Sequence, residues 1–281
     1  MSQPMTSVST LTLELEAWHN DPFEPGELDA QMPSIKSMFP NVTDVRMHRK
    51  RFTLPTLSTL LGHGGFTNLT SFQMISDDPF NPVHTNDIIA LLAEYSPALK
   101  YLVFLLLPDH PLFHWQWLPP LRTLTALTHL EIFVISCEFM ATTRNSNSAV
   151  VPASLRILHL ATGKPHSPHA ADTLMEALEA THEQANRGFY PNLREIRVDI
   201  ARSDVSMEEK YSETVVVEAR WSGLEILSKP NRQDTNLKRL GTFVEVFDEI
   251  GILLVPVIFP SGSGVSWPVR LASFPKELRD G

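Results

Sequence analysis

The chain has 281 residues, of which 43% are hydrophobic and 20% charged, and its formal net charge is -9. These proportions are typical of a folded chain, and the acidic balance argues against a general role on nucleic acid, whose phosphates must be neutralised by Lys and Arg. The single cysteine, Cys137, excludes an intrachain disulfide and favours a cytoplasmic or nuclear location, and no apolar stretch is long enough to cross a membrane.

A short apolar sequence motif, called here the phrase, recurs seven times along the chain. Each copy has an apolar residue, two spacers, a second apolar residue, one spacer and a third apolar residue. The copies are Val8-Leu11-Leu13, Val42-Val45-Met47, Leu69-Phe72-Met74, Leu99-Leu102-Phe104, Leu127-Leu130-Ile132, Leu155-Leu158-Leu160 and Leu193-Ile196-Val198. Repetition at intervals of 27 to 38 residues predicts a solenoid, in which each unit buries its apolar face against its neighbours.

The segments between the phrases carry the periodicity of helices. In chain order, we expect helices over 53–61, 85–95, 169–187 and about 237–247, with Gly188 and Gly251 as stops of the last two. A closing strand is expected at 252–259, and irregular loops at 108–120 and 141–149. Strands that alternate with helices predict an α/β fold with a parallel sheet and right-handed crossovers.

Three segments carry a resemblance to a known family: SPALKYLVF (96–104), VPASLRILHL (151–160) and YPNLREIRV (190–198). They resemble the strands of leucine-rich repeats, and more narrowly the degenerate repeats in the C-terminal part of fungal F-box/leucine-rich-repeat proteins. The resemblance covers residues 8–200. It implies a curved solenoid over residues 1–260, with a parallel sheet of about eight strands and helices on the convex side. Residues 261–281 would form a loosely ordered tail.

The chain departs from that family in two ways. The Asn or Cys that the family places three residues after the third apolar position is replaced throughout, by Glu16, Lys50, Asp77, Leu107, Ile135, Gly163 and Ala201. The first predicted strand begins by Val8, and so we expect no F-box ahead of it. The resemblance therefore implies a substrate-recognition solenoid, like that of a ubiquitin-ligase receptor, without its F-box. A non-functional fragment of an F-box protein stays an alternative.

No catalytic motif stands out, and we predict no enzyme activity, no catalytic residues, no cofactor and no bound metal. The sequence has no P-loop, no dinucleotide-binding fingerprint and no nucleophile elbow. Pairs of histidines at His110 and His114 and at His166 and His169 leave open a metal-dependent or small-molecule enzyme on an irregular α/β fold. A zinc site needs three or four ligands, so ordinary loop histidines are the simpler interpretation.

The spacers of the phrases point away from the core and line up across neighbouring strands. They predict a central apolar patch, ringed by polar side chains, that binds a protein partner. The predicted surface comprises Ile75, Tyr101, Val103, Leu105, Phe133, Arg46, His48, Glu131, His159 and Arg197. Tyr101 and Phe133 are the expected anchors, because aromatic side chains dominate interface hot spots. The alternative is that the loop at 108–120 covers the patch.

Overall fold

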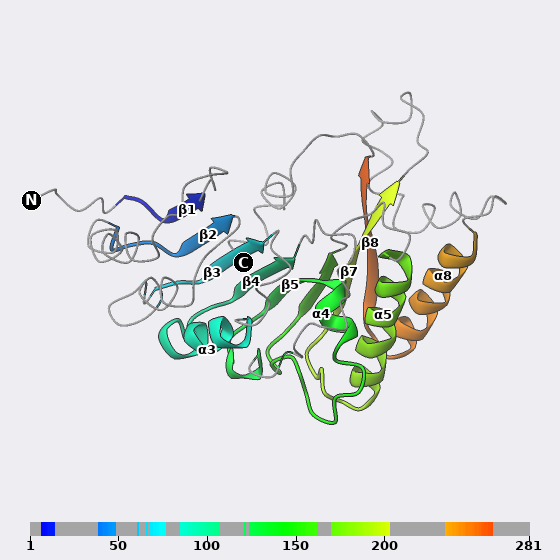
Figure 1. Ribbon diagram of the computed structural model, residues 1–281. Coiled ribbons are helices and arrows are strands. Elements are labelled where there is room, and N and C mark those ends of the chain that lie inside the picture. Colours follow the sequence, from blue (N-terminus) through cyan, green and yellow to red (C-terminus); the bar gives the residue numbers. More distant parts are fainter. Residues whose placement is uncertain are drawn as a thin grey trace, which may run out of the picture.

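A computed structural model describes residues 7–14, 39–48, 61, 66, 68–76, 85–106, 121, 124–161, 170–202 and 234–260. Eight parallel strands form one open sheet, and their order in the sheet is their order along the chain (Figure 1). They are β1 (Thr10–Glu14), β2 (Asp44–His48), β3 (Ser71–Ser76), β4 (Tyr101–Leu106), β5 (Ile132–Ser136), β6 (Ile157–Ala161), β7 (Glu195–Arg202) and β8 (Leu253–Pro260). The prediction of a parallel sheet of about eight strands within an α/β fold is confirmed.

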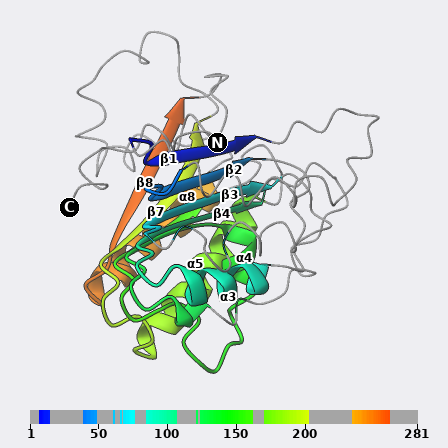
Figure 2. The same ribbon diagram turned by 90° about the vertical axis from the view of Figure 1, so that its left-hand side faces the viewer.

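The described helices all cover the same face of this sheet (Figures 1 and 2). They are α3 (Thr85–Tyr95), α4 (Cys137–Ala141), α5 (Ala170–Asn186) and α8 (Asp234–Glu249), together with the 3-10 turn η3 (Leu124–Ala126). The helices expected at 85–95, at 169–187 and near 237–247 are confirmed within a few residues. The helix expected at 53–61 lies outside the described residues, apart from the buried Leu61.

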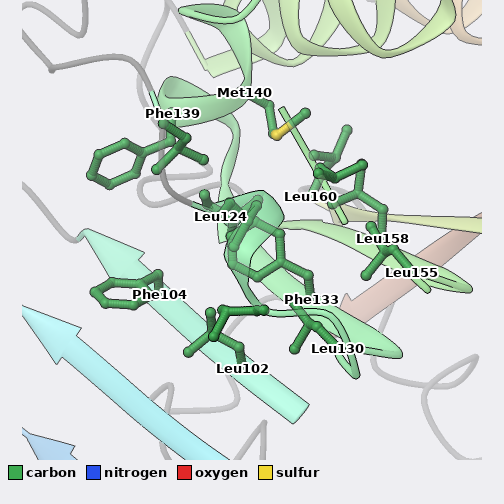
Figure 3. Packing of buried hydrophobic residues seen from close by; sticks show 14 of the residues in the cluster. Leu102, Phe104, Leu124, Leu130, Phe133, Phe139, Met140, Leu155, Leu158 and Leu160 are labelled. Carbon is green, nitrogen blue, oxygen red and sulfur yellow. The ribbon is translucent and has the colours of Figure 1, made fainter. Parts of the chain in front are cut away.

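The core lies between the sheet and these helices. The register aligns the second apolar residue of every phrase in one column, and each member from β2 to β8 is at most 5% exposed: Val45, Phe72, Leu102, Phe133, Leu158, Ile196 and Leu254. Figure 3 shows Phe133 among its core neighbours, with Met140 of α4 on the helix side. A single apolar cluster therefore runs from the second strand to the last.

The fifth phrase lies three residues further along the chain than predicted. Phe133 of β5 pairs with Leu102 and Leu158, so the buried phrase is Leu130-Phe133-Ile135 and the predicted Leu127-Leu130-Ile132 is wrong. Apolar residues recur every three positions here, at Leu124, Leu127 and Leu130, and so the pattern fits the sequence in two frames. Packing against the neighbouring strands selects the second frame.

Equivalent backbone hydrogen bonds mark the start of each strand. One carbonyl in each repeat accepts two consecutive N–H groups from the next repeat, at 2.8–3.2 Å, and the acceptors are Ser9, Thr43, Thr70, Lys100, Glu131 and Arg156. Just before β3, β4, β5, β6 and β7, the first phrase residue donates its N–H to the carbonyl three residues earlier, as in Leu99 to Ser96 and Leu193 to Tyr190. This recurring geometry places equivalent residues of successive repeats side by side.

Helices α5 and α8 end in the same way. Gly188 and Gly251 have φ angles of 75° and 74°, which suit a residue without a Cβ atom. After α5, the N–H of Phe189 donates to the Gln184 carbonyl and that of Gly188 to the Ala185 carbonyl; after α8, residues 247–252 repeat both bonds. This is the Schellman motif, and the two predicted glycine stops are confirmed.

Candidate functional site

The sheet face opposite the helices is called here the outer face. Two rows of side chains cross it from β1 to β8. The first row, at the strand starts, contains Thr10, Asp44, Ser71, Tyr101, Ile132, Ile157, Glu195 and Leu253. The second row contains Thr12, Arg46, Gln73, Val103, Val134, His159, Arg197 and Val255.

Four of the five predicted apolar patch residues do come together on the outer face. Ile75, Val103 and Leu105 form a cluster with Val134 and Ala161, against which the partly buried Tyr101 packs. The five cluster members are at most 6% exposed in the chain alone. They are therefore already removed from solvent, and only side chains at the margin of the cluster are open to a partner. The loop at 108–120, which was the alternative cover for this patch, lies outside the described residues.

Phe133 does not belong to this face. Its side chain is fully buried in the core on the helix side of the sheet. The prediction that Phe133 anchors a partner is wrong, because the three-residue shift of the phrase exchanges inward and outward positions in β5. Ile132 and Val134 occupy the outer face in its place.

Matching ion pairs lie near the two ends of the outer face, on β2 and β7. Arg46 donates to the Asp44 carboxylate at 2.8 and 3.0 Å, and Asp44 also accepts a bond of 3.0 Å from the Ser71 hydroxyl. At the other end, Arg197 donates to Glu195 at 2.6 Å. In both pairs the carboxylate lies in the first row and the arginine two residues later in the second. Arg46 and Arg197 are thus largely neutralised within their own strands.

The remaining polar residues of the predicted surface have different positions. His159 is on the outer face but is 1% exposed, next to Val134. His48 ends β2, where the structure describes its backbone but not its side chain. Glu131 precedes β5 and so belongs to the edge where the strands start rather than to the face.

This strand-start edge carries a column of charged side chains, of which the sequence analysis predicted only Glu131. Lys100, Glu131, Arg156 and Arg194 occupy the same position in four successive repeats, because each donates its N–H to the equivalent carbonyl of the repeat before it. The Glu131 carboxylate lies 3.5 Å from Lys100 Nζ and 3.7 Å from Arg156 Nη1. The sequence did contain a signal for this column: in three phrases the first leucine is followed directly by Lys or Arg, as in Leu99-Lys100, Leu155-Arg156 and Leu193-Arg194.

Between the charged column and the buried cluster lies a strip of partly exposed apolar side chains. It consists of Tyr101, Ile132 and Ile157, which are adjacent in the first row. At the end of the same row, Leu253 is 43% exposed. We call Tyr101, Ile132 and Ile157 the apolar strip. Together with the charged column it forms an accessible surface of mixed character over β4 to β7.

Within the described part of the chain, no group of three or more His, Cys, Asp or Glu side chains is arranged to hold a metal ion. The histidine pairs on which the metal-dependent alternative depends lie at 110–114 and 166–169, outside the described residues. No helix in the described ranges has the length and apolar character to cross a bilayer. No protein-family model and no curated protein matches the sequence.

Proposed function

We propose that this chain is a non-catalytic protein-binding scaffold built like a leucine-rich-repeat solenoid, and that the partner contacts the apolar strip and the adjoining strand starts. The strand order and the recurring bonds at the strand starts support a repeat architecture, since each unit contacts mainly its neighbours. Following the resemblance to fungal F-box proteins, the bound protein is a substrate presented to a larger assembly. We place this activity in the cytosol or nucleus, where the buried thiol of Cys137 stays reduced.

One observation carries the proposal. Three apolar side chains from successive strands, Tyr101, Ile132 and Ile157, stay partly exposed although the cluster beside them is buried. Flat apolar strips bordered by charge are typical of recognition surfaces, in which the apolar centre supplies affinity and the charged margin supplies orientation. The three side chains project from paired strands of one sheet, so little further ordering of the backbone is needed for binding.

Co-purification from native cell extract tests the proposal. The bait would be the full chain, and the variants would be Ile132→Ser and Ile157→Ser, singly and together. We expect the double variant to lose most of a reproducible set of captured proteins while it keeps its cooperative melting transition. A matched control is Leu91→Ser in α3, since Leu91 is also a partly buried aliphatic side chain but lies on the helix side.

The control decides how a loss of captured proteins is interpreted. Proteins lost with Ile132→Ser and Ile157→Ser but kept with Leu91→Ser would support the strip as the binding surface. The proposed function would be contradicted if the strip variants captured the same proteins as the parent chain. It would also be contradicted if the parent chain captured no proteins above background.

A further inference from the structure

The charged column at the strand starts gathers positive side chains in a chain whose formal net charge is -9. It brings three cations, Lys100, Arg156 and Arg194, together with one carboxylate, Glu131. The side chains of Lys100 and Arg156 are 56% and 60% exposed, and Arg194 is also exposed. These cations are therefore available to an external group.

The charges within the column are poorly compensated. Glu131 is shared between two cations at 3.5 and 3.7 Å, which is longer than the 2.7–2.9 Å typical of a charge-assisted hydrogen bond. Arg194 makes no ion pair among the described residues, and its backbone lies on the strand next to that of Arg156, at the usual strand spacing of about 4.8 Å. An acidic side chain placed between these two arginines would be attracted by both. By contrast, Arg46 of β2 and Arg197 of β7 already have carboxylate partners in their own strands.

We propose that this edge binds an acidic, extended segment of the partner protein, in which acidic and apolar residues alternate. The acidic side chains pair with Arg156, Arg194 and Lys100, and the apolar ones rest on the adjacent strip of Tyr101, Ile132 and Ile157. From Lys100 to Arg194 the column spans three strand spacings, which four or five residues of extended chain cover at about 3.3 Å per residue. This inference rests on the proposed function, because it assigns the chemistry of the partner at the same surface.

Fluorescence anisotropy on the full chain tests the inference with defined probes. The probes are labelled nine-residue peptides of alternating Glu and Leu, of alternating Lys and Leu, and of alternating Glu and Ser. We expect the Glu-Leu peptide to bind, with an affinity that falls as salt rises, and the other two to bind much more weakly. The paired variant Arg156→Gln with Arg194→Gln should weaken binding of the Glu-Leu peptide roughly tenfold.

Two further variants separate recognition from a structural role. Glu131→Gln removes the internal competitor for the cations and should strengthen binding of the Glu-Leu peptide about two- to fivefold, which a loss of structure would not do. Arg144→Gln is the matched control, because Arg144 is 49% exposed and paired with Glu179 away from the column, and it should leave the affinity unchanged.

The outcomes distinguish this inference from the proposed function. No binding of the Glu-Leu peptide, equal weakening by Arg144→Gln, or weaker binding with Glu131→Gln would each overturn the acidic-segment inference. If captured cellular proteins depend on Ile132 and Ile157 but not on Arg156 and Arg194, the proposed function stands and the acidic-segment inference alone is wrong.

Discussion

Neighbouring residues in β5 have opposite environments. Phe133 is fully buried among core side chains, whereas Ile132 lies on the outer face and stays partly exposed. Removing most of a buried aromatic side chain costs the transfer free energy of its atoms and leaves a cavity. Truncating a partly exposed side chain costs much less, because water or small movements can fill the space.

This contrast gives a direct stability prediction. Phe133→Ala should lower the free energy of unfolding by about 3–5 kcal/mol, and Ile132→Ala by less than about 1.5 kcal/mol. Urea denaturation of the two variants without any partner provides the measurement. Equal losses, or a larger loss for Ile132→Ala, would show that the frame of β5 is misassigned.

Glu138 of α4 is half-buried as a residue, but its carboxyl oxygen Oε2 is shielded from solvent. Burial raises its pKa to about 7, and a hydrogen bond from its own backbone N–H opposes this shift. Its Oε2 atom has no hydrogen-bond partner among the described residues. The folded state thus favours the protonated carboxyl, whereas the unfolded chain releases that proton near pH 4.3–4.5.

The sign of the pH effect follows from this difference. Between about pH 4.5 and 7 the folded chain holds a proton that the unfolded chain has lost, so the contribution of Glu138 to stability falls as pH rises and is constant above 7. Glu138→Gln should match the parent chain near pH 4 and be more stable by about 1–3 kcal/mol at pH 8. Chemical denaturation of both proteins across this range checks the difference. A gap that does not change with pH would contradict the burial of the carboxyl.

At the scale of elements, two glycines in helical regions offer a matched pair. A Cβ atom at Gly188 or at Gly241 would meet no atom within 4 Å, so neither substitution creates a clash. The two sites differ in backbone conformation, since Gly188 has a φ of 75° and Gly241 lies within α8. Only conformational preference therefore separates the effects of an added methyl group.

Gly188→Ala should destabilise the chain by about 1–2 kcal/mol, because an L-residue is strained in the left-handed conformation. Gly241→Ala should stabilise it by about 0.5–1 kcal/mol, because alanine is the better helix former. Thermal melts of both variants test the opposite signs. Changes of the same sign would contradict the assigned end of α5.

The sequence predicted the helices well where the helical periodicity of apolar residues continues over several turns and a glycine marks the end of the helix. The stripes of α3, α5 and α8 extend over several turns, and Gly188 and Gly251 define two of the ends. Helix α4 was missed because five residues, Cys137–Ala141, are too few to show a helical period. The frame of β5 was missed because leucines recur every three residues before it, and only contacts with β4 and β6 choose between the frames.

At the scale of the whole molecule, the order and direction of the strands were predictable, but the open part of the outer face was not. Alternation along a strand assigns each side chain to a face. It does not say what else lies over that face, so the sequence leaves open whether the patch of Ile75, Val103 and Leu105 is exposed or covered, and in the structure these three side chains are buried. Lys100, Arg156 and Arg194 could not be predicted from alternation, because they lie just before the strands, where alternation assigns no face.

The central claim is that a partner protein lies along the strand starts of β4 to β7, and site-directed photo-crosslinking tests it most directly. Benzoylphenylalanine would replace Ile132 or Ile157 in the full chain, and Glu183 on the exposed side of α5 would serve as the control position. After irradiation in native cell extract, we expect discrete adducts from positions 132 and 157 and none from position 183. Adducts that arise only from position 183, or equally from all three positions, would contradict the account.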